Sequence, residues 1–176
     1  VAVSSGTVNM SSGTLSGAGA FTINGLFTWT GGTMTGTGST TTGGGMSLPS
    51  GNIVGIDSVR TMTVPGPATV TWNGSGNVAI GNGATVVNNG TWDCQSNATL
   101  YNPYGGSSAF NNGGTFKKSA GSGTTTVSTP FSNSGAVQAL AATLNFQGSY
   151  TETAGSTTLN GGTITSTNPM NIDGGT

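Results

Sequence analysis

A short phrase recurs along the chain and limits the possible folds more than any other feature. The phrase has six positions in order: an apolar residue, Asn or Ser, any residue, Gly, Thr or Ala, and a second apolar residue. Its last Gly lies at positions 90, 114, 135 and 162, at intervals of 24, 21 and 27 residues. A longer echo aligns residues 6–15 with residues 135–144 without gaps. Such repetition is typical of folds in which each unit packs only on its neighbours.

Between the copies, apolar residues alternate with polar ones. Pairs such as Val8/Met10 and Trp92/Cys94 follow a period of two, which is the period of a β-strand with one buried face. Each run is three to five residues long and ends at Gly, Asn, Ser or Pro, as expected of short strands. We therefore expect seven aromatic side chains to point inward: Trp29, Trp72, Trp92, Phe110, Phe116, Phe131 and Phe146.

Short strands joined by repeated Gly-rich corners predict an all-β fold, a right-handed parallel β-solenoid of about eight coils with almost no helix. A single segment would span residues 1–176. An antiparallel sandwich is the alternative, because it also has short strands and turn signals. The repeated phrase then marks a corner, where Gly and Asn tolerate positive φ and stacked Asn side chains can bond from coil to coil.

Two kinds of stretch interrupt this pattern. Proline cannot donate a hydrogen bond to a neighbouring strand, so the prolines of residues 48–51 and 64–67 should lie at corners or edges. Residues 101–106 read as an exposed loop on the rod. Within that loop, Tyr101 and Tyr104 are the candidate ligand-contact residues.

Composition excludes several functional classes. Only 4% of the residues are charged, the net charge is −1 and histidine is absent, so the chain offers no basic surface for nucleic acid or an anionic membrane. Apolar runs are too short to span a membrane. Cys94 is the one cysteine. Because it is in phase with Trp92, we expect it to be a small buried residue.

The titratable residues do not form a catalytic or metal-binding pattern. The four acids are widely separated in sequence, and general acid–base chemistry needs paired groups within reach of a substrate. We predict no enzyme activity, no catalytic residue, no metal ligand and no cofactor. Asp57 and Arg60 should form a solvated ion pair, while the adjacent Lys117 and Lys118 should point to opposite faces.

The stretches "GNGATVVNNGTWD", "FNNGGTFKKSAGSGTTTVSTPFSNSGAV", "TLNFQGSYTETAGSTTLNGGTI" and "FTWTGGTMTGTGSTT" carry a family resemblance. They are similar to Gly/Thr/Asn-rich repeats of large secreted and surface proteins of bacteria. Filamentous-haemagglutinin and autotransporter passengers are better-known proteins of this type. The resemblance covers most of the chain and implies an extracellular β-solenoid, with no particular chemistry.

These observations favour a structural rod segment of an extracellular fibre, stalk or surface adhesin. Val1–Val3 and Asp173–Thr176 look like cuts through a continuing pattern. We therefore expect a segment of something longer, stacked end to end on copies of itself, covalently or between subunits. Glycans are the other expected partner. Asn-x-Ser/Thr sequons place candidate glycosylation at Asn9, Asn73, Asn89 and Asn97.

Two alternative functions stay open. The first is ice binding by outward Thr-x-Thr rows, such as residues 61/63, 69/71, 124/126 and 163/165. Irregular sequence intervals between these pairs disfavour it, and threonine suits any outward strand position. The second is a carbohydrate-binding adhesin module that uses Tyr101 and Tyr104.

Overall fold

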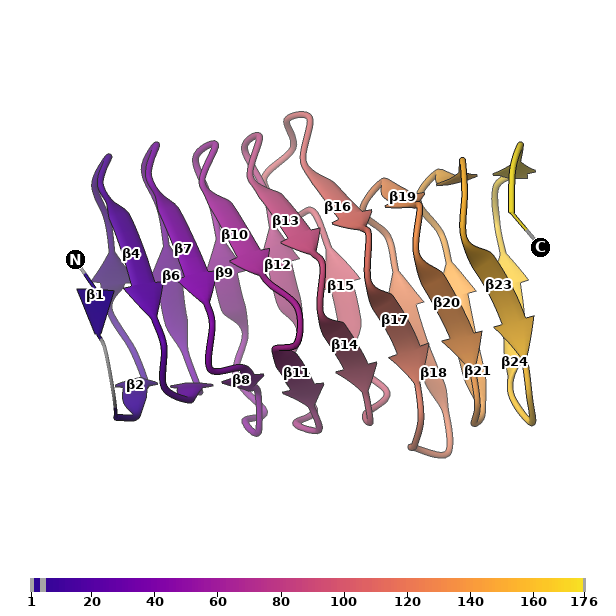
Figure 1. The fold of residues 1–176 in the computed structure, drawn as a ribbon, viewed down its shortest axis with the longest axis horizontal. Coiled ribbons are helices and arrows are strands. Elements are labelled where there is room, and N and C mark those ends of the chain that lie inside the picture. Colours follow the sequence, from indigo (N-terminus) through magenta and orange to yellow (C-terminus); the bar gives the residue numbers. More distant parts are fainter. Residues whose placement is uncertain (1, 4–5, 176) are drawn as a thin grey trace.

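The computed structural model describes residues 2–3 and 6–175, which form 25 strands and no helix. The strands wind into a parallel β-solenoid (Figure 1). In that view the chain descends on the near side, passes underneath and rises on the far side while advancing towards the C-terminal end, so the winding is right-handed. Every strand pair in the described part is parallel, which confirms the solenoid and excludes the sandwich. Val1 and Thr176 lie outside the described residues.

Three sheets run along the rod, each built from every third strand. Sheet A contains β1 (Ala2–Val3), β4 (Ala20–Ile23), β7 (Ser39–Thr42), β10 (Thr61–Val64), β13 (Thr85–Asn88), β16 (Ala109–Asn112), β19 (Phe131–Asn133), β22 (Tyr150–Glu152) and β25 (Met170–Ile172). Sheet B contains β2 (Val8–Met10), β5 (Phe27–Trp29), β8 (Met46–Ser47), β11 (Thr69–Trp72), β14 (Thr91–Cys94), β17 (Thr115–Lys118), β20 (Ala136–Ala139) and β23 (Ser156–Leu159). Sheet C contains β3 (Thr14–Leu15), β6 (Gly32–Met34), β9 (Val54–Ile56), β12 (Val78–Ile80), β15 (Thr99–Tyr101), β18 (Thr124–Val127), β21 (Thr143–Phe146) and β24 (Thr163–Ser166).

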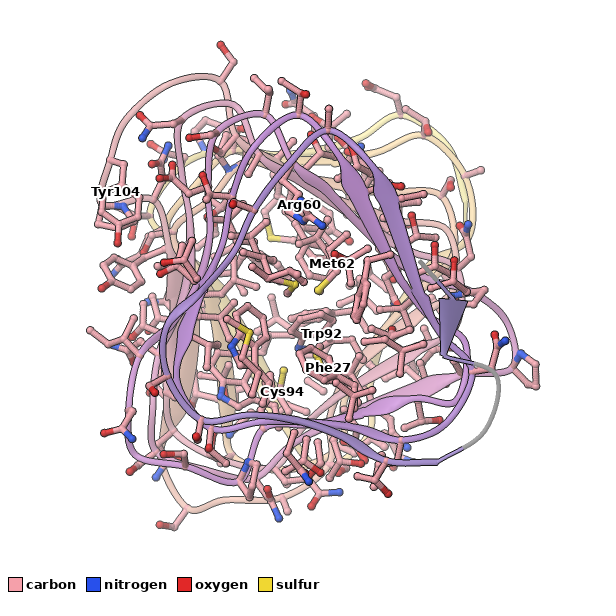
Figure 2. The ribbon with its side chains drawn as sticks, turned by 90° about the vertical axis from the view of Figure 1, so that its left-hand side faces the viewer. Phe27, Arg60, Met62, Trp92, Cys94 and Tyr104 are labelled. Atoms are coloured by element: carbon pink, nitrogen blue, oxygen red, sulfur yellow. The ribbon has the colours of Figure 1, made fainter. Side chains whose placement is uncertain are left out.

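Residues of the same phase stack in register from coil to coil. In sheet B, for example, Val70 pairs with Trp92, Trp92 with Phe116 and Phe116 with Val137. All seven aromatic side chains expected to point inward are at most 1% exposed. Figure 2 shows Phe27, Met62 and Trp92 inside the ribbon. The period-two prediction is therefore confirmed for the apolar residues.

The aromatic rings form a continuous path through the core from Trp72 to Tyr150. Trp92 meets Phe110 edge-on with 5.2 Å between ring centroids, and Phe110 stacks on Phe131 at 5.2 Å. Phe131 in turn stacks on Tyr150 at 5.7 Å. Aromatic pairs at these separations add to the stability gained from burial alone.

Proline lies at corners, as predicted. Pro49 falls between β8 and β9, and Pro65 and Pro67 fall between β10 and β11. The segment of residues 43–68 thus continues the solenoid. The sequence predicts a loop at residues 101–106; the structure has it at residues 102–108, between β15 and β16, and Tyr101 is the last residue of β15 rather than part of the loop.

The repeated corner differs from the prediction in two respects: one of the four copies lies at a different corner, and the reason for glycine is different. Gly90, Gly114 and Gly135 stack at the corner between sheets A and B, but the next residue in this column is Gly155. Gly162 lies at a different corner, between β23 and β24. Nor is positive φ the reason for glycine at position 114, where φ is not positive. A Cβ on Gly114 would lie 2.1 Å from the Gly90 carbonyl oxygen, so close stacking of the coils excludes a side chain.

Candidate functional site

Asp57, Asp93 and Glu152 lie on different coils, and each carboxylate has its own hydrogen-bond partners. Within the described part of the chain, His, Cys, Asp and Glu side chains do not gather in groups of three that could hold a metal. Asp93 accepts hydrogen bonds from Gln95 and Ser119 and lies 3.6 Å from the Lys117 ammonium. Asp93 is buried, whereas 29% of the Lys117 side chain is exposed, and an ion pair with a partly exposed lysine contributes little to stability.

The predicted ion pair between Asp57 and Arg60 is wrong. Asp57 Oδ1 accepts bonds from the Ser58 backbone N–H and from Asn82 Nδ2, at 2.8 and 2.7 Å. Arg60 is 1% exposed and points into the solenoid (Figure 2). Its guanidinium donates to Thr40 Oγ1 and to backbone carbonyls of earlier coils, those of Gly17, Thr35 and Ser39. Burial lowers the pKa of Arg60, and oxygen acceptors rather than a carboxylate hold the cation.

The inner side of sheet A carries a column of buried amides that we call the asparagine ladder: Asn88, Asn112 and Asn133. Asn88 Nδ2 donates to Asn112 Oδ1, and Asn112 Nδ2 donates to Asn133 Oδ1, both at 2.7 Å. Sequence reasoning anticipated such stacking at the corner. The structure places it in the core, since the three residues are at most 1% exposed.

Glu152 continues the ladder on the next coil. Its Oε2 accepts bonds from Asn133 Nδ2 and from the Tyr150 hydroxyl, both at 2.8 Å, and from Thr157 Oγ1. Burial acts to raise the pKa of Glu152, but these three hydrogen bonds together lower it below its ordinary value. A buried carboxylate with such partners stays ionised.

The two adjacent lysines behave as predicted. Lys117 points outward to Asp93, whereas Lys118 is fully buried. The Lys118 ammonium donates to the carbonyls of Ser96 and Ala120 and to Thr125 Oγ1, at 2.8, 3.1 and 2.9 Å. Burial lowers the pKa of Lys118. Cys94 is fully buried beside it, which confirms the prediction for the thiol.

The loop of residues 102–108 folds back over the preceding coil. The Tyr104 ring lies against the backbone of Gly81, because a Cβ there would be 2.5 Å from Tyr104 Cδ2. The Asn82 backbone N–H donates to the Gly105 carbonyl at 2.8 Å. Tyr104 remains 50% exposed and stands outside the ribbon in Figure 2.

Tyr101 lies beside a column of small residues on the outer side of sheet C. It pairs with Ala79, which pairs with Gly55. Two exposed aliphatic residues, Ile53 and Val59, precede and follow β9, with 52% and 53% of their surface exposed. We call these residues together with Tyr104 the tyrosine face: Ile53, Gly55, Val59, Ala79, Tyr101 and Tyr104, of which Gly55 and Ala79 are buried beneath the others. Sequence reasoning found the two tyrosines and missed the aliphatic and small residues.

Both ends of the described solenoid present inward-facing apolar residues that lack a further coil. Val8, Met10 and Leu15 line a cavity at one end, which we call the N-terminal end face. Leu159 and Ile172 at the other end, the C-terminal end face, are 57% and 55% exposed. Their register partners on the preceding coil, Ala139 and Glu152, are buried.

The four sequon asparagines are all exposed. Asn97 Oδ1 already accepts a hydrogen bond from the Gly123 backbone N–H at 2.9 Å. Among the described residues, the Asn73 side chain has no hydrogen-bond partner. Asn89 lies at the repeated corner, one residue after the buried Asn88.

Comparison with protein-family models, curated proteins and solved structures finds no match for this chain. Within the described residues, no helix is long and apolar enough to cross a membrane.

Proposed function

We propose that the chain is a structural rod segment of an extracellular fibre, stalk or surface adhesin, stacked end to end with copies of itself. The observation that carries this proposal is the regular parallel stacking of three sheets along the whole described part of the chain. The inward rows reach both end faces, where apolar residues are available to pack on a further coil.

The two end faces are complementary in register. A second copy placed with its N-terminal end face on the C-terminal end face would continue the inward rows, with Met10 following Leu159 and Val8 following Thr157. The edge strands would also gain backbone partners, because an exposed strand edge carries unpaired N–H and C=O groups. Contacts of this head-to-tail kind propagate into filaments when they do not close into rings.

Sedimentation and electron microscopy of the 176-residue chain test this assembly. We expect concentration-dependent growth into rods with a width of one solenoid. Replacing Leu159→Asp or Leu15→Asp should shorten the rods, because a buried unpaired charge is costly. Leu26→Asp is the matched control, since Leu26 is exposed on the side of the rod. A wild-type chain that stays monomeric at every concentration reached would contradict the proposal.

The extracellular location and glycosylation are part of the same proposal. The bacterial-surface resemblance of the repeats and the exposure of the sequon asparagines support them. Intact mass of the protein from its native source tests glycosylation, with Asn73 and Asn9 as the first sites to map. A mass equal to that of the bare polypeptide would contradict it, and immunogold labelling of intact cells would test the location.

Ice binding is a second candidate, because one outer face arranges hydroxyls in regular columns. In sheet A, Ser39, Thr61 and Thr85 form one column, and Thr22, Thr41 and Thr63 form the next. We call these six residues the threonine array. Corners of different lengths absorb the irregular sequence intervals, so the columns repeat at ~4.8 Å between coils and ~6.6 Å along the strand.

The remaining Thr-x-Thr pairs weaken this second candidate, because they do not share a face. Residues 69/71 lie in sheet B, whereas 124/126 and 163/165 lie in sheet C. Thermal hysteresis and ice recrystallisation measure the activity directly. Thr41→Tyr and Thr63→Tyr should abolish it if the threonine array binds ice, and Thr126→Tyr on sheet C should leave it intact. Absence of activity in the wild-type chain would eliminate this function.

A further inference from the structure

We propose that the tyrosine face is a binding site for a neutral, β-1,4-linked polysaccharide. This inference does not depend on end-to-end assembly. It commits to one class of ligand, whose pyranose rings carry apolar C–H faces and equatorial hydroxyls. Three features support this ligand class: an aromatic platform, free polar groups beside it, and a surface of suitable length.

The aromatic platform is Tyr104. One side of its ring is fixed against the Gly81 backbone, where even a Cβ would clash. Its loop is held in place by the bond from Asn82 N–H to the Gly105 carbonyl and by the bond from Tyr104 N–H to Asn102 Oδ1, at 3.2 Å. Half of the Tyr104 surface remains exposed. A fixed ring loses little conformational entropy on binding, which favours contact with the flat face of a sugar.

Polar groups without partners stand next to this ring. Ile56 pairs with Ile80, so the next residues along the two chains, Asp57 and Gly81, are neighbours. Asn82 Nδ2 donates a hydrogen bond to Asp57 Oδ1 at 2.7 Å. Within the described residues, Asn82 Oδ1, Asp57 Oδ2 and the Tyr104 hydroxyl have no hydrogen-bond partner. Two oxygen acceptors and a hydroxyl beside an aromatic ring match the alternating hydroxyls of a pyranose, since a few placed polar groups give orientation and specificity in binding sites.

The surface beside the platform follows the strand direction of sheet C. Gly55 and Ala79 are buried beneath it, and the four-residue offset from Ile53 to Asp57 spans ~13 Å of extended chain. Such a length accommodates more than one sugar ring. Only Asp57 contributes a charge, which disfavours polyanionic ligands, and that leaves neutral chains as the matching class.

Backbone strain is concentrated at the same place. Ser58 and Val59 have φ values of 57° and 54°, and a β-branched residue in this region is a genuine outlier. The conformation keeps Val59 exposed above Gly83, whose Cβ would lie 2.9 Å from Val59 Cγ1. Strained backbone conformations of this kind cluster at active sites and ligand sites.

The test is titration with two soluble probes, a β-1,4-linked glucose hexamer and a β-1,4-linked N-acetylglucosamine hexamer. Calorimetry gives the affinity, and NMR reports on the Tyr104 ring. We expect at least one hexamer to bind wild type and to shift the Tyr104 resonances. Tyr104→Ser should weaken binding at least about tenfold, through loss of stacking, whereas Tyr104→Phe should bind within a fewfold of wild type.

Leu26→Ser is the matched control, because it removes an exposed apolar side chain elsewhere on the rod and should bind like wild type. Circular dichroism establishes that each variant is folded, and the NMR shifts of wild type keep the test valid if Tyr104→Ser does not fold. Failure of both hexamers to bind wild type would overturn the proposal. Binding that leaves the Tyr104 resonances unchanged, or that survives Tyr104→Ser, would overturn it as well. Filament growth is measured separately, so the two proposals fail independently.

Discussion

Asn133 donates its side-chain amide to Glu152 Oε2 at 2.8 Å, and this contact joins three stacked amides to a buried carboxylate. In each step of the ladder the Nδ2 group points towards the C-terminal end, so the donor end of the amide column meets an acceptor-only group. An ionised carboxylate can accept several bonds without offering a donor. The order of residues, amides first and carboxylate last, therefore satisfies the donor end of the column, whereas Asn88 Oδ1 at its other end is buried without a hydrogen-bond partner among the described residues.

Removing this carboxylate should change how stability depends on pH. The pKa of Glu152 is lowered in the folded state, so the carboxylate stabilises the fold above its unfolded pKa of about 4.3. That stabilisation is lost as pH falls through the lowered folded pKa. Glu152→Gln should cost about 2 kcal/mol at neutral pH and should make the unfolding free energy fall less steeply in acid. Urea unfolding across pH measures both effects.

Asp173→Asn is the matched control for this experiment. Asp173 is an exposed carboxylate near the same end of the rod, so its removal should leave the acid profile close to that of wild type. An acid profile of Glu152→Gln that coincides with wild type would show that the buried carboxylate is not linked to folding.

Alanine substitution in the asparagine ladder should destabilise the fold much more than alanine substitution of an outward-facing neighbour. Asn112→Ala removes its bonds to Asn88 and Asn133 and to two backbone carbonyls. We expect a loss of roughly 3 kcal/mol in unfolding free energy, because partners in a buried network are left unpaired. Asn111→Ala, one residue earlier and exposed, should change stability by at most ~0.5 kcal/mol. Equal losses would contradict the inward ladder.

The two lysines should react very differently with an amine-acylating reagent. Lys117 has 29% of its side chain exposed, whereas Lys118 is buried with three oxygen partners. Acylation of Lys118 requires local opening, so we expect it to be at least about tenfold slower than that of Lys117 in the native protein. In denaturing urea the rates should converge. Peptide mass spectrometry measures both, and equal native rates would place Lys118 at the surface.

A period of two in the sequence predicts the sheets and the apolar core, and the same period applies to the buried polar residues. Asn88, Lys118 and Glu152 each lie two residues after an inward apolar residue, Val86, Phe116 and Tyr150 respectively. Arg60 lies two residues before Met62. These polar residues share the inward phase and are all buried. Charged residues usually stay in solvent, and this general rule led to the wrong prediction for Arg60, whereas the period of two correctly separates Lys117 from Lys118.

The partners of these buried groups could not be predicted from sequence. Arg60 is bound to oxygens of Gly17 and Thr35, which are 43 and 25 residues away. These contacts depend on how corners of unequal length stack. The same holds for the tyrosine face, where a loop reaches back onto Gly81. Sequence identifies the exposed tyrosines, but only the stacking of coils shows which small residues lie under them.

The corner glycines give the last prediction. A Cβ on Gly114 would lie 2.1 Å from the Gly90 carbonyl oxygen, and a Cβ on Gly135 equally close to that of Gly114. Gly114→Ala must therefore push two coils apart. Strain of this kind typically costs about 1–3 kcal/mol in unfolding free energy, and we expect the upper end of that range here because the displaced coils are stacked. Gly19→Ala is the control, because a Cβ there meets nothing within 4 Å and its φ is not positive. It should be neutral or slightly stabilising, since alanine restricts the unfolded chain. Thermal unfolding followed by circular dichroism compares the two variants, and a Gly114→Ala protein as stable as the Gly19→Ala protein would contradict the close stacking of coils at this corner.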